Sequence, residues 1–209
     1  MENCRKILQQ GLQELNIVSD ETQLELLLDF IKLLEKWNKA YNLTAVRNRE
    51  DMARLHILDS LTVLPFIQGK QVADIGTGAG LPGIPLAIFL PDVKFTLIDS
   101  NAKKTRFVQQ AILELKLKNI KVMHSRVENM KTDSLFSTVI MRAFANLQDI
   151  MRLTRHLLDK QGILLAMKGQ KPDEELIKID ERYSIIPVNV PGVEAERCVI
   201  RIEGIAENG

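Results

Sequence analysis

Three glycines and two aspartates in the middle of the chain have the spacing of a site for an adenosine-containing cofactor. Gly76, Gly78 and Gly80 alternate in a short loop after an apolar segment, with Asp74 two residues before the first of them, and Asp99 ends the next apolar segment. Glycine lets a backbone approach a ligand closely. An acidic residue at the end of the second strand of a βαβ unit accepts hydrogen bonds from ribose hydroxyls. The spacing therefore predicts an adenosine cofactor.

The glycine loop fits two patterns. Residues 78–83 match the dinucleotide fingerprint G-x-G-x-x-G, which indicates a nicotinamide cofactor. Residues 74–80 have the pattern acid-x-G-x-G-x-G, which resembles the first motif of methyltransferases that use S-adenosylmethionine (SAM). Asp74 favours SAM, because a dinucleotide fold normally places an apolar residue there. Its carboxylate is expected to face the methionine ammonium of the cofactor.

Basic residues follow three of the predicted strands. Ligands of open parallel sheets bind at the carboxyl ends of the strands, and Arg126, Arg142 and Lys168 lie just beyond such ends. Each of them alone is typical of a surface ion pair. Their convergence at one edge of the sheet favours an anionic substrate over a small neutral one.

The elements that must position these residues form two regions. Residues 1–65 are predicted to be an N-terminal helical extension, with a capping box at Asp20 and Gln23 and a further helix over 50–64. Over residues 66–209, strands and helices alternate, which predicts an α/β core with a mostly parallel sheet and an antiparallel C-terminal hairpin. We expect the two regions to pack as one domain. Strands are expected at 71–75, 94–99, 120–124, 138–141, 163–167, 184–190 and 197–202, and helices at 84–89, 103–115, 149–158 and 173–179.

The composition is that of an ordinary globular protein. The 209 residues can bury a substantial core, and 45% are hydrophobic and 26% charged. The formal net charge is +1, so any nucleic-acid contact must come from a local patch. We see neither an apolar run of membrane-spanning length nor a signal peptide, and we expect a cytoplasmic protein. Cys4 and Cys198 lie far apart, which predicts neither a zinc site nor a disulfide framework.

Nearly the whole chain resembles the bacterial ribosomal RNA small subunit methyltransferase G family, also called glucose-inhibited division protein B. The similarity lies in residues 36–44, 56–60, 74–85, 125–128, 142–145 and 168–169. Its most specific part is Gly-Leu-Pro-Gly-Ile-Pro at 80–85. The resemblance implies a class I SAM-dependent methyltransferase fold (Rossmann-like), with S-adenosylhomocysteine as the product. The acceptor it implies is N7 of one guanine, at position 527 in the 530 loop of 16S rRNA. We expect a monomer that acts on a 30S subunit or an assembly intermediate, without a metal.

The resemblance also implies roles for single residues. It places five residues at the SAM site, namely Gly76, Leu81, Val127, Glu128 and Arg142. To these the loop pattern adds Gly78 and Asp99. Arg142 is also expected to position the acceptor base.

Three further cations are candidates for holding the RNA substrate. Arg126 and Lys168 follow predicted strands, and Arg197 begins the last one. For Arg197 there is an alternative, in which it pairs with Glu194 or Glu196 in the hairpin and contributes only stability.

The residue types agree with methylation of a ring nitrogen. Guanine N7 has a free lone pair at neutral pH, so the enzyme needs no general base and acts mainly by alignment. The chain lacks a Pro-Pro pair, which excludes the motif of exocyclic-amine methyltransferases. His56, His124 and His156 have no metal-ligand spacing and are expected to be structural, and Trp37 is expected to pack in the core.

Two other functions remain open at this point. An NAD(P)-dependent oxidoreductase would use the alternative glycine pattern, but Tyr41 and Tyr183 are poorly placed as proton donors. A non-catalytic RNA-binding module would keep the cations and lose the cofactor acid, whereas this chain retains Asp99.

Overall fold

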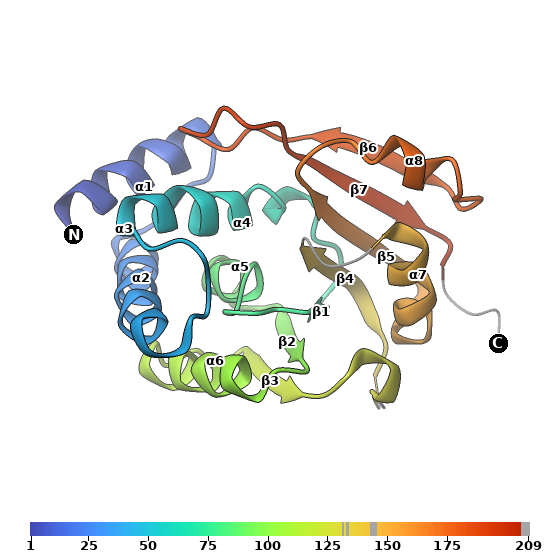
Figure 1. Ribbon diagram of the computed structural model, residues 1–209, viewed down its shortest axis with the longest axis horizontal. Helices are drawn as coiled ribbons and strands as arrows, with labels where there is room; N and C mark the ends of the chain where they lie inside the picture. Colours follow the sequence, from blue (N-terminus) through green and yellow to red (C-terminus); the bar gives the residue numbers. More distant parts are fainter. Residues whose placement is uncertain (131, 133, 143–145, 206–209) are drawn as a thin grey trace.

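The computed structural model describes residues 1–130, 132, 134–142 and 146–205 (Figure 1). Within these residues, seven strands form one sheet in the order β3-β2-β1-β4-β5-β7-β6. The strands are β1 (Gln71–Ile75), β2 (Lys94–Asp99), β3 (Ile120–His124), β4 (Phe136–Arg142), β5 (Leu158–Lys168), β6 (Tyr183–Pro187) and β7 (Cys198–Glu203). Strands β1 to β5 pair in parallel, and β7 is antiparallel to both β5 and β6. This architecture confirms the predicted fold class.

Helices cover both faces of the sheet. They are α1 (Glu2–Glu14), α2 (Glu21–Tyr41), α3 (Arg49–Met52), α4 (Asp59–Leu61), α5 (Gly83–Phe89), α6 (Ala102–Glu114), α7 (Leu147–Thr154) and α8 (Asp173–Leu176). Between α3 and α4 lies a π-helical segment, η1 (Ala53–Leu58), and three 3-10 turns are η2 (Leu64–Phe66), η3 (Val127–Asn129) and η4 (Arg155–Leu157). Figure 1 shows α1 to α6 on one side of the sheet and α7 on the other.

Alternation along the strands explains these two layers. Successive side chains of a strand point to opposite faces of the sheet. Phe95 and Leu97 of β2 are therefore buried on the face that carries the N-terminal helices, whereas Ile98 is buried on the α7 face. Because helices cover both faces, the central strands β1, β2 and β4 are mostly apolar and buried on both sides.

The N-terminal helices pack onto the same core as the sheet. Leu27 and Ile31 of α2 are fully buried in one cluster with Val72 of β1. The predicted capping box at Asp20 and Gln23 is present. The division of the chain at residues 65 and 66 stays a prediction.

Trp37 lies near the end of α2, where its ring stacks on Tyr41 at a centroid distance of 5.2 Å and packs against the tilted ring of Phe107 at 5.7 Å. The predicted packing role of Trp37 is confirmed.

Several bounds differ from the prediction. The helix expected over 50–64 runs from Arg49 to Leu61, and η1 interrupts its α-helical hydrogen bonds. Strand β5 begins at Leu158 because that residue pairs with Phe136, so the preceding helix ends earlier than expected. Helix α8 ends at Leu176, and the edge strand β6 ends at Pro187, which has no N–H. Among the described residues, no helix has the length and apolar character to cross a membrane.

Candidate active site

The glycine loop connects β1 to α5 at the carboxyl end of the sheet. The backbone N–H groups of Gly76 and Thr77 donate to the Ile98 carbonyl at 2.8 and 3.1 Å, which holds the loop against β2. Gly76, Gly78 and Gly80 have φ angles of 68°, 59° and 81°, a region that favours glycine. A Cβ atom on Gly78 would make only van der Waals contacts, with the Gly76 carbonyl oxygen at 3.9 Å and Lys104 Nζ at 4.0 Å. The loop therefore leaves room for a ligand beside its backbone.

Asp99 lies at the end of β2 and holds this loop. Its Oδ2 accepts a hydrogen bond from the Gly78 N–H at 2.8 Å, and its Oδ1 accepts one from the Asn101 N–H at 2.8 Å. Asp99 also lines a pocket of about 200 Å³, together with Gly76, Val127 and Glu128. Four of the predicted cofactor residues therefore meet at one cavity, which we call the loop pocket.

Three predicted cofactor residues are not in the lining of the loop pocket. Gly78 lies in the adjacent glycine loop, where its N–H donates to Asp99. Leu81 is buried in the core with 3% of its surface exposed. Arg142 ends β4 and lines a second cavity.

Asp74 lies beneath the glycine loop. Its Oδ2 accepts hydrogen bonds from the Thr77 hydroxyl at 2.7 Å and from the Gly83 N–H at 2.9 Å. Its buried Oδ1 has no hydrogen-bond partner among the described residues. Burial raises the pKa of the Asp74 carboxyl from 3.8 to about 6, although these hydrogen bonds oppose the shift. A Cβ atom on Gly83 would come within 2.8 Å of Oδ2, so the contact requires glycine.

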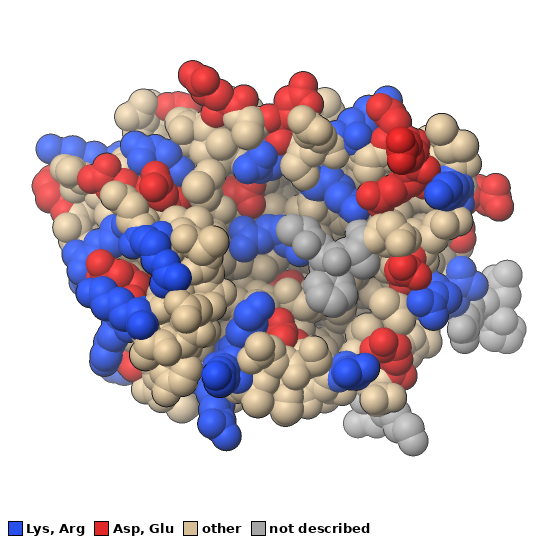
Figure 2. Space-filling view, viewed as in Figure 1, with Lys and Arg blue, Asp and Glu red and all other residues tan. Residues whose placement is uncertain are grey.

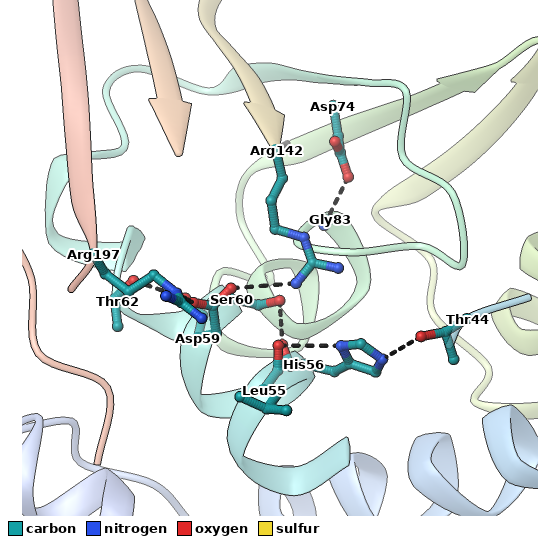
Figure 3. A network of polar contacts seen from close by, with 10 residues as sticks. All are labelled: Thr44, Leu55, His56, Asp59, Ser60, Thr62, Asp74, Gly83, Arg142 and Arg197. Carbon is teal, nitrogen blue, oxygen red and sulfur yellow. Dashed lines mark hydrogen bonds and ion pairs between the residues drawn. The ribbon is translucent and has the colours of Figure 1, made fainter. Parts of the chain in front are cut away.

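The second cavity lies where β4 and β5 end, between η1, α4 and the residues before β7. Its volume is about 330 Å³. Asp59 lies between two arginines: Arg142 Nη1 is 3.3 Å from Oδ2, and Arg197 Nε is 3.3 Å from Oδ1 (Figure 3). Figure 3 also shows that the Arg142 side chain extends between Asp74 and Asp59. We call this cavity the Asp59 pocket.

The position of Arg197 differs from one expectation and from the alternative given with it. Arg197 lies one residue before β7 rather than within the last strand. Its guanidinium forms an ion pair with the Asp59 carboxylate rather than with that of Glu194 or Glu196, and Nη1 donates to the Glu196 backbone carbonyl at 2.8 Å. The reason is topological: β7 pairs antiparallel with β5, so its first residue, Cys198, lies opposite Lys168 at the carboxyl end of β5.

The structure brings three of the four predicted cations together. Arg142, Lys168 and Arg197 line the Asp59 pocket, whereas Arg126 is exposed and lines the loop pocket. Lys168 Nζ pairs with Glu175 at 2.9 Å. Figure 2 shows Lys and Arg side chains at a hollow near the centre of this face and beside it. The similar segment 143–145 lies outside the described residues.

His56 is buried beside the Asp59 pocket. Its Nδ1 lies 3.1 Å from the Leu55 carbonyl and its Nε2 lies 2.8 Å from the Thr44 hydroxyl. A carbonyl only accepts, so Nδ1 carries the hydrogen and Nε2 accepts from Thr44. Burial and the charge of Arg142 lower the pKa of His56 to about 4. His56 is therefore a neutral residue with both ring nitrogens in use.

Two residues near the cavities have no role predicted from the sequence. Asp59 belongs to the similar segment 56–60. The one sequence feature that could have indicated a role for Asp59 is its position as a carboxylate among apolar residues of a predicted helix. Lys104 lies in the first turn of α6, with Nζ 4.0 Å from the Cβ position of Gly78. Nothing in its local spacing indicates that position.

Comparison with known proteins identifies relatives over nearly the full chain. The family model of rRNA small subunit methyltransferase G (GidB) matches residues 23–200. Ribosomal RNA small subunit methyltransferase G of Legionella pneumophila (strain Philadelphia 1) is 48% identical over 198 residues, which cover 95% of this chain and 94% of that protein. The protein of the same name from Pseudomonas syringae pv. tomato is 49% identical over 193 residues, covering 91% of this chain and 92% of the relative.

Solved structures with lower identity share the fold. Magnesium protoporphyrin IX methyltransferase from Synechocystis PCC 6803, solved with bound SAM, has a TM-score of 0.58 at 17% identity, covering 83% of this chain and 97% of that one. A SAM-dependent methyltransferase from Aquifex aeolicus has a TM-score of 0.57 at 17% identity, covering 73% and 93%.

Proposed function

The chain belongs to the rRNA small subunit methyltransferase G family, and from this premise we propose that it transfers a methyl group from SAM to N7 of one guanine in the 530 loop of 16S rRNA. The observation that carries the proposal is the adjacency of the two cavities. Ile75 lines the loop pocket and pairs with Met141, the neighbour of Arg142 in the Asp59 pocket. A donor site and a basic acceptor site would thus share one edge of the sheet.

The residues around the glycine loop fit SAM. When bound, SAM supplies an electrophilic methyl group on a sulfonium. Asp99 would accept hydrogen bonds from the ribose hydroxyls, and the loop at Gly76 and Gly78 leaves space for the cofactor. The unpartnered Oδ1 of Asp74 offers an acceptor for the methionine ammonium. Family resemblance adds Val127, Glu128 and Arg142 to this site.

Besides binding SAM, the protein must align the guanine N7 with the methyl group of the cofactor. Because N7 already has a lone pair, these side chains need only hold the base and exclude competing orientations. His56 is neutral from pH 6 to pH 8, since its pKa lies near 4. At saturating SAM, single-turnover rates are therefore expected to vary little over this range, because titration of Asp74, whose pKa is about 6, would act only on SAM binding. Arg142 would orient the base, and Arg126, Lys168 and Arg197 would contact phosphates.

Several aspects of the proposal go beyond the residues of the site. We infer that the substrate is a 30S subunit or an assembly intermediate, that the enzyme acts as a monomer without a metal, and that it works in the cytoplasm. S-adenosylhomocysteine would be released.

One experiment tests the reaction directly. The protein is incubated with methyl-labelled SAM and 30S particles from cells that lack it, and N7-methylguanine is then mapped by strand cleavage. We expect one modified position, in the 530 loop. Label at another position or atom would contradict the proposal.

A thermal-shift titration separates the alternatives. SAM and S-adenosylhomocysteine should raise the melting temperature, and NAD should not. Stabilisation by NAD would favour the oxidoreductase, and RNA binding without a shift by any of the three would favour the non-catalytic module.

A further inference from the structure

The Asp59 pocket has the chemistry of a site for a purine base. Apolar side chains of Leu55, Met167 and Val199 line it, and the Asp59 carboxylate lies among them. Only 10% of the Asp59 side chain is exposed, so its charge is largely removed from water. Enzymes that modify bases recognise an extruded base by apolar contacts to its faces and hydrogen bonds to its Watson–Crick edge. The cavity offers both kinds of contact.

Asp59 has acceptor capacity beyond its two arginines. An ionised carboxylate has about four acceptor positions. Each oxygen of Asp59 receives one arginine, both at the long distance of 3.3 Å. Acceptor positions therefore remain at the pocket that Asp59 lines.

Resting on the proposed function, we propose that the Asp59 pocket holds the acceptor guanine and that the Asp59 carboxylate recognises its N1–H and N2–H groups. These two donors are adjacent on the Watson–Crick edge of guanine, and a carboxylate presents two adjacent acceptors. Adenine has an acceptor at N1 and no amino group at C2, so it would place a lone pair against the carboxylate. Asp59 is thereby the residue that selects guanine.

The neighbouring residues agree with this orientation. On guanine, O6 lies between N1 and N7 along the edge of the base. Arg142 lies between Asp59 and Asp74 (Figure 3), so it can donate to O6 while Asp59 holds N1 and N2. N7 is then directed from Asp59 past Arg142, toward the side of the glycine loop.

The negative charge of Asp59 also suits the product. The N7 lone pair forms the new carbon–nitrogen bond while the sulfur–methyl bond breaks, and its electron pair remains on sulfur. No proton moves, and the base becomes a cation. A buried carboxylate on the far edge of the base stabilises that developing charge.

The test uses 30S particles assembled with 16S rRNA that carries inosine at the acceptor position. Inosine retains N7, O6 and N1–H and lacks only the N2 amino group. Losing a hydrogen bond to a charged acceptor should lower kcat/KM of the wild-type enzyme tenfold to a hundredfold relative to guanine. Equal rates on guanine and inosine would overturn the proposal without any variant. Failure to methylate the guanine particle at N7 would instead overturn the proposed function.

Variants then assign the recognition to Asp59. In Asp59→Ala, the guanine-to-inosine ratio should fall to within about threefold of one. The matched control is Asp51→Ala, because Asp51 is an exposed carboxylate on the preceding helix α3, outside the pocket. It should keep the wild-type ratio. If Asp59→Ala does not fold, Asp59→Leu measures the same ratio, because leucine is similar in shape to aspartate and has no hydrogen-bond acceptor. A wild-type ratio in a folded Asp59 variant would show that Asp59 only holds the arginines, and would overturn the proposal.

Discussion

The Asp99 carboxylate is shared between the glycine loop and the loop pocket, since it accepts the Gly78 N–H and also lines the cavity. Asp99→Asn keeps one acceptor for the loop and removes the charge. Hydrogen bonds to charged groups contribute about 1.5–3 kcal/mol, so SAM affinity should fall about tenfold to a hundredfold. Calorimetry would measure this, with Asp92→Asn, an exposed carboxylate before β2, as the control. Unchanged affinity in Asp99→Asn would remove Asp99 from the cofactor site.

Asp74 should make the free energy of unfolding depend on pH. Its pKa is about 6 in the folded protein against 3.8 ordinarily, so between these values the folded state holds a proton that the unfolded chain releases. Its contribution therefore stabilises the protein as the pH falls through this window, by up to about 3 kcal/mol. Urea denaturation from pH 4.5 to pH 7.5 should show wild type gaining stability over Asp74→Asn on acidification. Parallel curves for the two proteins would contradict the raised pKa.

Among the elements, the π-helical segment η1 determines how His56 and Asp59 are presented. π-Helical turns are rare and often occur at functional sites. A polar ladder holds η1 to the end of α2: Asn38 Oδ1 accepts the Thr44 N–H at 2.9 Å, and the Thr44 hydroxyl donates to His56. These contacts give Asn38 and Thr44 of the similar segment 36–44 a structural role.

Thr44→Val should break this ladder. Removing the hydroxyl leaves the buried His56 Nε2 without its donor, which typically costs about 1–3 kcal/mol. We expect a lower free energy of unfolding by that amount and an unchanged SAM affinity, measured by denaturation and calorimetry. Thr44→Ser keeps the hydroxyl and should restore most of the stability. If serine restores nothing, the methyl packing of Thr44 matters and the hydrogen bond does not.

At the scale of the whole molecule, the net charge of +1 provides little general attraction to RNA. Local cations must then carry the salt dependence of binding, and each phosphate contact contributes roughly one unit or less to the slope of log affinity against log salt. Arg126 is exposed and forms no ion pair within the part of the chain that the structure describes, whereas Arg197 pairs with Asp59.

Arg126→Ala should therefore flatten the salt slope for 30S binding without changing the melting temperature. Arg197→Ala should flatten the slope and also lower the melting temperature, because it leaves Asp59 with one arginine. Lys94→Ala is the control, since Lys94 begins β2 and therefore lies at the amino end of the strands, away from both pockets. A wild-type slope in both arginine variants would place the RNA-contacting face elsewhere, with the N-terminal helices as the next candidate.

Local sequence patterns were sufficient for the elements that form the cofactor half of the site. The expected strands at 71–75, 94–99 and 120–124 have the bounds of β1, β2 and β3. Burial on both faces makes β1 and β2 mostly apolar, the edge strand β3 is only partly buried, and a glycine or polar residues follow each of them. The π-helical form of η1 was not predicted, because apolar residues at helical spacing fit an α-helix and a π-helix equally well.

The amino-acid order alone determined the loop chemistry, since Gly76, Gly78 and Asp99 lie within one βαβ unit whose geometry is local. Only the tertiary structure decided how the Asp59 pocket is assembled. Asp59 contacts Arg142, which is 83 residues away in the sequence, and Arg197, which is 138 residues away. Such contacts depend on strand order and on the antiparallel register of β7 against β5. The residues next to Arg197 in the sequence indicate neither of these, so the sequence could offer only the adjacent glutamates as alternative partners.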